Sequence, residues 1–113
     1  VDDTTLTNGT YVAMNNTSAD VHIGQLASTY SDGNIDETAI FSSELSQTDV
    51  TTIYNSGVPN DISAMSGLVS FWRMGEDAAW DGSNWALPDN GSGGNDGDSV
   101  SMPLASRTSD VPT

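Results

Sequence analysis

Apolar and polar residues alternate along several short stretches of the chain, and this alternation predicts strands. Asn8-Gly9 separates two strand-like runs, and an Asn-Gly pair tolerates the positive φ values of a two-residue hairpin turn. The stretches VHIGQL at 21–26 and IDETAIF at 35–41 are predicted as two further strands. The most apolar run, GLVSFWRM at 67–74, predicts a strand that is buried on both faces.

One short helix is predicted in a chain otherwise rich in turn and strand formers. Ser46 can cap its first turn, and Asp49 three residues later suits a capping box. Gly57 supplies the left-handed residue that ends it, so the helix spans about 46–56. Because so short a helix is marginal alone, we expect its apolar face to dock on a larger element. That face comprises Val50, Ile53 and Tyr54.

The remaining segments lack periodicity. Residues 58–66 are interpreted as a linker, and the Gly-, Asp- and Asn-rich stretch 75–97 as a long loop that is either functional or mobile. SVSM at 99–102 predicts one more short strand.

The excess of acidic residues limits the kinds of partner that the chain can bind. Sixteen acidic residues face two basic ones, and the net charge is −14. A surface this negative repels phosphate, which excludes nucleic acid and anionic membrane surfaces as partners. The acidity fits a solvated surface, solubility in salt, or divalent-cation binding. No apolar run is long enough to insert in a membrane, and no cysteine is present for disulfides. Val1 at the start indicates a processed chain or a piece of a longer one.

The order of these motifs resembles the C-terminal part of a laminin-G-like, concanavalin A-like jelly-roll domain. The match covers about residues 6–57 and ends on the short helix. The resemblance implies an all-β fold, an antiparallel β-sandwich with one short docking helix near 46–56. The motifs that carry it are Asn8-Gly9, Ile23-Gly24, GNIDETAIF at 33–41, Leu45-Ser46 and YNSG at 54–57.

A second stretch resembles the opening of the same kind of domain, yet it follows the closing motif. It comprises GLVSFWRMGE at 67–76 and DNGSGGNDG at 89–97. The chain therefore divides into 1–57, a linker at 58–66, and an opening-type strand with loop and tail at 67–113. Three explanations stay open: a junction of tandem domains, a circular permutation, or a strand that completes the same or a neighbouring subunit's sheet. The family's middle strands are missing, which indicates a fragment of something larger.

Candidate chemistry is sparse. Asp36 and Glu37 are adjacent on a predicted strand, so their side chains should point to opposite faces and cannot act as a glycosidase pair. His22 is the only histidine and suggests no triad. The chain is predicted to be no enzyme. The resemblance implies a structural calcium ion held by Asp36 and Glu76, against the alternative that Asp36 makes only a hydrogen bond.

Three aromatic residues in loops, Trp80, Trp85 and Tyr30, could stack on sugar faces, or the tryptophans could pack over a sheet edge. The resemblance, which extends loosely to marine bacteriophage proteins, predicts a structural or adhesion module on a particle exterior. We expect an extracellular or virion location, with virion or fibre subunits as partners in an oligomer and a cell-surface glycan as ligand. The alternatives are a carbohydrate-binding module of a secreted bacterial protein and a fibre subunit assembled by strand exchange.

Overall fold

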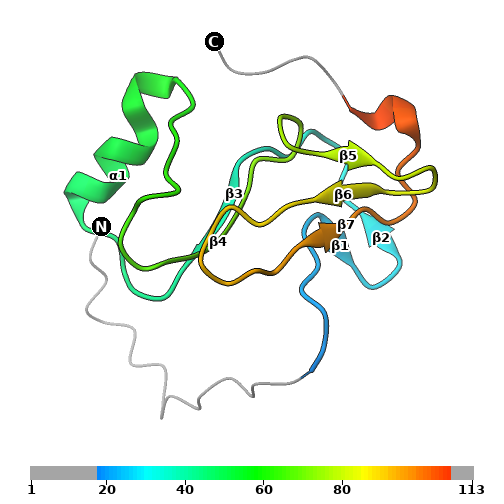
Figure 1. Cartoon of the computed structure of the whole chain (residues 1–113), viewed down its shortest axis with the longest axis horizontal. Coiled ribbons are helices and arrows are strands. Elements are labelled where there is room, and N and C mark those ends of the chain that lie inside the picture. Colours follow the sequence, from blue (N-terminus) through cyan, green and yellow to red (C-terminus); the bar gives the residue numbers. More distant parts are fainter. Residues whose placement is uncertain (1–17, 108–113) are drawn as a thin grey trace. The chain divides into compact units, whose positions relative to one another are not determined.

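The computed structural model describes residues 18–107 (Figure 1). The hairpin predicted at Asn8-Gly9 lies outside this range. The chain forms two compact units, residues 1–31 and 32–113, which are considered separately. In the described part, the elements are short strands in small antiparallel sheets and one short helix, an all-β arrangement in general terms. No helix among residues 18–107 is long and apolar enough to cross a membrane.

The first unit contains a small hairpin. β1 (Gln25–Leu26) pairs with β2 (Thr29–Tyr30), and Ala27 in the turn adopts a φ of 53°. Ser31 N–H donates to the Gly24 carbonyl at 2.8 Å and closes the hairpin. The strand predicted at 21–26 is therefore confined to its last two residues. Leu26 is 82 % exposed, so the apolar alternation there does not bury this side chain.

The central pair of the second unit joins β3 (Thr38–Phe41) and β4 (Leu68–Trp72), which run antiparallel (Figure 1). The apolar run at 67–74 thus pairs with the IDETAIF strand of the same chain, which is the intrachain alternative. Ser70 and Phe71 are almost fully buried, as expected for a strand covered on both faces. The register shifts between Ile40 and Phe41, where a bulge interrupts the ladder.

The predicted strand at 35–41 is shorter than expected at its start. Glu37 adopts a φ of 49°, a left-handed conformation that breaks an extended ladder. β3 therefore begins at Thr38, opposite Trp72 at the end of β4.

The helix begins as predicted. α1 (Gln47–Tyr54) has Ser46 as its N-cap, and the Ser46 hydroxyl accepts from the Asp49 N–H at 3.2 Å. The Asp49 carboxylate in turn accepts from the Ser46 N–H at 2.9 Å, which completes the capping box. The helix ends two residues earlier than predicted, because Asn55 adopts the left-handed conformation at the C-cap. Ser56 and Gly57 continue with positive φ in a 3₁₀ turn, η1 (Asn55–Gly57).

The helix docks on the core through a single residue. Ile53 packs against the core, whereas Val50 and Tyr54 remain 46 % and 67 % exposed. The expected docking of the whole apolar face is therefore wrong. The buried core consists of Ile62, Leu68 and Phe71, flanked by Ala39, Phe41, Ile53 and Met65. Ile62 belongs to the segment interpreted as a linker, so this segment contributes directly to the core.

The stretch 75–97 contains strands that sequence reasoning missed. β5 (Ala79–Trp80), β6 (Trp85–Leu87) and β7 (Gly97–Asp98) form a three-stranded antiparallel sheet, which Figure 1 shows beside the β3–β4 pair. The strand predicted at 99–102 is displaced to β7. A short 3₁₀ turn, η2 (Leu104–Ser106), follows.

Candidate functional site

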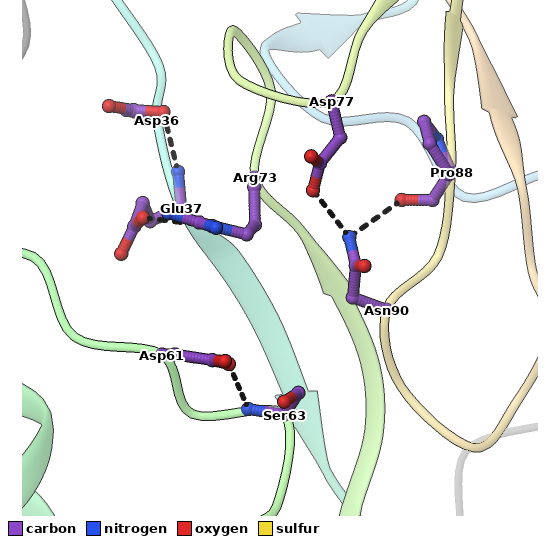
Figure 2. A network of polar contacts seen from close by, with 8 residues as sticks. All are labelled: Asp36, Glu37, Asp61, Ser63, Arg73, Asp77, Pro88 and Asn90. Atoms are coloured by element: carbon purple, nitrogen blue, oxygen red, sulfur yellow. Dashed lines mark hydrogen bonds and ion pairs between the residues drawn. The ribbon is translucent and has the colours of Figure 1, made fainter.

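Two charged side chains meet where the segment before β3 passes the end of β4. Thr38 lies opposite Trp72, so the next residues outward, Glu37 and Arg73, face each other. Glu37 Oε1 and Arg73 Nε are 3.5 Å apart, and neither atom has a hydrogen-bond partner among the described residues (Figure 2). The pair is an ion pair with loose geometry at the edge of the core.

Asp36 lies beside this pair. Its Oδ1 accepts from the Glu37 N–H at 3.0 Å (Figure 2). Partial desolvation and the charge of Glu76 raise the pKa of Asp36 above its usual value. Desolvation also raises the pKa of Glu37, with Arg73 opposing the shift and Asp36 and Glu76 adding to it. Desolvation and the neighbouring negative charges thus raise both pKa values, and the Arg73 guanidinium opposes them only in part.

Asp36 and Glu37 precede β3, so the strand alternation that predicted opposite faces for them does not apply. The left-handed φ of Glu37 breaks the alternation, and both residues line one shallow groove of about 210 Å³. The other wall of this groove comes from the C-terminal end of α1 and the turn that follows. Its lining residues are Ile53, Tyr54, Gly57, Val58 and Pro59.

Asp36 and Glu76, the residues of the predicted calcium site, are close enough for the charge of Glu76 to raise the pKa of Asp36. Calcium takes about six to eight oxygen ligands. No group of three or more His, Cys, Asp or Glu side chains within residues 18–107 is arranged to hold a metal ion. Backbone carbonyls and waters would have to supply the other ligands, so this calcium site stays a prediction.

A second polar feature was missed by sequence reasoning. The glycine-rich loop 89–96 runs along β4 on the edge opposite β3, and Asp89 ties it there. Asp89 Oδ1 accepts from the N–H groups of Phe71 and Gly91, and Oδ2 accepts from Asn95 N–H, each at 2.8 Å. Partial burial acts to raise the pKa of Asp89, but these three donors outweigh it and hold the pKa below the usual value.

The same loop satisfies the outer edge of β4. Asn90 N–H donates to the Phe71 carbonyl at 2.8 Å, and Gly93 N–H donates to the Val69 carbonyl at 2.7 Å. Gly91 is needed for space, because a Cβ there would lie 2.4 Å from the Val69 carbonyl oxygen. The oxygen-rich loop therefore covers a strand edge, and the Asp89 carboxylate is committed to backbone donors.

The candidate sugar-stacking residues are aromatic side chains of the small sheets. Trp85 is buried, and its ring meets Trp80 edge to face with centroids 5.5 Å apart. Trp80 is half-buried, while Tyr30 on β2 is 53 % exposed and belongs to the first unit. Trp80 and Trp85 thus lie in strands β5 and β6 and not in loops, and sugar stacking by these residues stays a prediction. His22 Nδ1 lies 3.1 Å from Gln25 Oε1, within hydrogen-bond distance, and the pair is exposed.

Sequence signals for the missed residues existed in part. Arg73 is one of two basic residues and follows the buried strand, so pairing of that strand with IDETAIF would have placed an acidic residue beside it. No signal in the sequence indicated which of several loop aspartates would bind the β4 backbone.

Comparison of the chain with models of known families, with curated proteins and with solved structures finds no match. The resemblance to laminin-G-like domains stays a prediction.

Proposed function

We propose that the chain is a non-enzymatic structural or adhesion module on the exterior of a particle, with a phage virion as the particle. In this proposal its small antiparallel sheets belong to a laminin-G-like jelly roll. Its partners are other subunits of the same particle, and the assembly is oligomeric.

The observation that carries the proposal is how the chain uses its carboxylates. Six aspartate side chains accept hydrogen bonds from backbone N–H groups and so hold turns, the helix cap and the β4 edge. They are Asp36, Asp49, Asp61, Asp81, Asp89 and Asp96. A carboxylate held in this way is part of the scaffold, which supports a structural role.

The lowered pKa values of Asp49, Asp61 and Asp81 point the same way. The Ser46 hydroxyl and N–H lower the pKa of Asp49, and the Ser63 N–H lowers that of Asp61. The N–H groups of Asn84 and Ser83 lower the pKa of Asp81. A general acid or base works best with a pKa near the operating pH, and these shifts move the groups away from it.

The test is location on intact particles. Antibodies raised against the expressed chain, carried on gold, should label virions purified from the source material, and peptides of the chain should appear in their mass spectra. Detection of the chain only in the particle-free fraction would refute the proposal.

Glycan binding is the second candidate, and exposed Tyr30 and half-exposed Trp80 favour it. A glycan array should then show binding that Tyr30→Ala or Trp80→Ala removes, while His22→Ala leaves it unchanged. An array without signal contradicts this ligand class. The fibre alternative is less favoured, because β4 is already paired with β3 and covered by loop 89–96.

A further inference from the structure

The shallow groove between the C-terminal end of α1 and the segment before β3 combines two kinds of wall. One side is formed by Asp36 and Glu37, and the other is apolar, with Tyr54 and Val58 67 % and 46 % exposed. At about 210 Å³ the groove is smaller than the roughly 300–1,000 Å³ of pockets for small molecules. Its size therefore suits one side chain of a partner.

Three sources of negative potential converge on this groove. Asp36 and Glu37 lie on one side, and Glu76 is near enough to raise the pKa of both. On the other side the helix presents its carbonyl end, and the last turn of α1 contains no basic residue to balance it. A cation in the groove would relieve the repulsion among these groups.

The chain offers little with which to fill the groove. It has no lysine, and of its two arginines Arg73 already pairs with Glu37. A second copy of the chain is an unfavourable occupant, because each copy has a net charge of −14 and the two would repel. Charge complementarity thus indicates a basic partner of different sequence.

We propose that this groove is a docking site for a lysine or arginine side chain of a partner protein, flanked in the partner by apolar residues. The aliphatic stem of the basic side chain lies against Ile53, Tyr54 and Val58, and its charged end meets Asp36 and Glu37. The Tyr54 ring adds a cation–π contact. The inference rests on the proposed structural or adhesion role, for which it names the chemistry of the partner.

The experiment uses the whole chain, labelled with ¹⁵N, and follows its amide signals by NMR. The probe is the capped tripeptide acetyl-Val-Lys-Val-amide, with the same peptide carrying norleucine or arginine in place of lysine. We expect the lysine and arginine peptides to shift the amides of residues 36–37 and 53–58, and the norleucine peptide to leave them unmoved. At about 10 mM peptide, a complex with a Kd of about 1 mM is nearly saturated, so even weak docking is visible.

Matched variants separate docking from general attraction to an acidic surface. Asp36→Asn combined with Glu37→Gln should weaken binding about five- to tenfold, whereas Glu44→Gln combined with Asp98→Asn removes the same charge elsewhere and should not. Asp36→Asn alone keeps the Glu37–Arg73 pair and tests the site without disturbing that contact.

Equal weakening in both double variants, shifts spread over the acidic surface, or no shifts at all would overturn the proposed groove. Virions that are still labelled by antibody after such a result would leave the structural role standing and reject only the docking site. Unlabelled virions would reject the structural role itself.

Discussion

Replacement of Asp89 by alanine should destabilise the protein strongly, because this side chain ties loop 89–96 to β4. The substitution removes the acceptor for three backbone N–H groups, those of Phe71, Gly91 and Asn95. Asn95 lies on the exposed part of the loop, and its N–H can bind water instead. Phe71 has no exposed surface, so its N–H would be left unsatisfied in the core.

The magnitude follows from these differences. A hydrogen bond to a charged group contributes about 1.5–3 kcal/mol, and a buried donor without a partner costs about 1–3 kcal/mol. Because only the Asn95 N–H can readily turn to water, we expect Asp89→Ala to lower the free energy of unfolding by about 3–5 kcal/mol. Asp89→Asn keeps one acceptor oxygen for Phe71 and Gly91 but turns an NH₂ group toward Asn95 N–H. We therefore expect it to lie between wild type and alanine, at about 1–3 kcal/mol.

The assay is urea unfolding followed by tryptophan fluorescence. Trp72 reports on this region, because its Nε1–H donates to the Asn95 carbonyl at 2.9 Å and the loop must leave when the sheet opens. Asp81→Asn is the matched control. Asp81 uses a single oxygen for both of its backbone donors, so the amide can keep both bonds and the midpoint should stay near that of wild type.

The pH dependence gives a second check, and its sign follows from the lowered pKa of Asp89. The unfolded carboxyl titrates near 3.8 and the folded one below that value, so the stabilisation by the ionised form is present in full above 3.8. It is lost as the pH falls through the folded pKa. The gap in stability between wild type and Asp89→Ala should therefore be constant from pH 7 to about 5 and shrink below 3.8. Equal midpoints for Asp89→Ala and Asp81→Asn, or a gap that widens in acid, would refute the reasoning.

Three further predictions concern the loop, the helix and the calcium hypothesis. Gly91→Ala should lower the free energy of unfolding by about 1–3 kcal/mol, because the added Cβ overpacks against the β4 backbone. Gly75→Ala is the control, since a Cβ there meets nothing within 4 Å and should be tolerated in the same urea melts. Equal effects of the two substitutions contradict the close contact at Gly91. Ser46→Ala should cost about 1 kcal/mol through the lost cap. Ile53→Ala should cost about 1–2 kcal/mol, below the range for full burial because Ile53 is half-buried, and no loss would mean an undocked helix. A calcium ion at Asp36 predicts that chelator lowers the Tm and that Asp36→Asn removes this sensitivity, whereas a melting curve indifferent to chelator contradicts the site.

Local rules predicted the elements whose determinants lie within a few residues of one another. The capping box of Ser46 and Asp49 is such a case, since both of its hydrogen bonds span three residues. The burial of the run 67–74 was also predictable, because a strand without polar alternation has no face suited to water. The predicted end of α1 lies too late in the sequence, because glycine is the usual left-handed residue at a helix end and Gly57 fits that rule. Asn55 also tolerates the left-handed conformation, and it ends the helix earlier.

The sheet at 79–98 was missed for a physical reason. Its strands are two or three residues long, too short for a period of two to stand out from a turn-rich stretch. Hydrogen bonds to a residue outside these strands hold β6 in place. Ser99 Oγ accepts from the Trp85 N–H at 2.8 Å, and Ser99 N–H donates to the Trp85 carbonyl at 2.9 Å. A buried serine that pairs with residues fourteen positions away leaves no local signature.

The groove was missed because one backbone angle overrides the rule that adjacent strand residues face opposite sides. The rule holds only while φ stays extended, and Glu37 leaves that region at the start of β3. The bond that Glu37 N–H donates to Asp36 holds the two residues together, and the ion pair with Arg73 draws the Glu37 side chain toward the end of β4. These contacts bring Asp36 and Glu37, whose pKa values are both raised, into one groove beside the carbonyl end of α1.

A left-handed glutamate is unfavourable in itself, so removal of its ion-pair partner Arg73 should release Glu37 from this conformation. Arg73→Gln should therefore let Glu37 relax toward an extended φ and move its carboxylate away from Asp36. The ¹³Cα shift of Glu37 should report the change of φ, and the pKa of Asp36 should rise further, because the Arg73 charge and the Glu37 N–H that lower it are both withdrawn. An unchanged Glu37 ¹³Cα shift would mean that the helix side of the groove, and not the ion pair, holds this conformation.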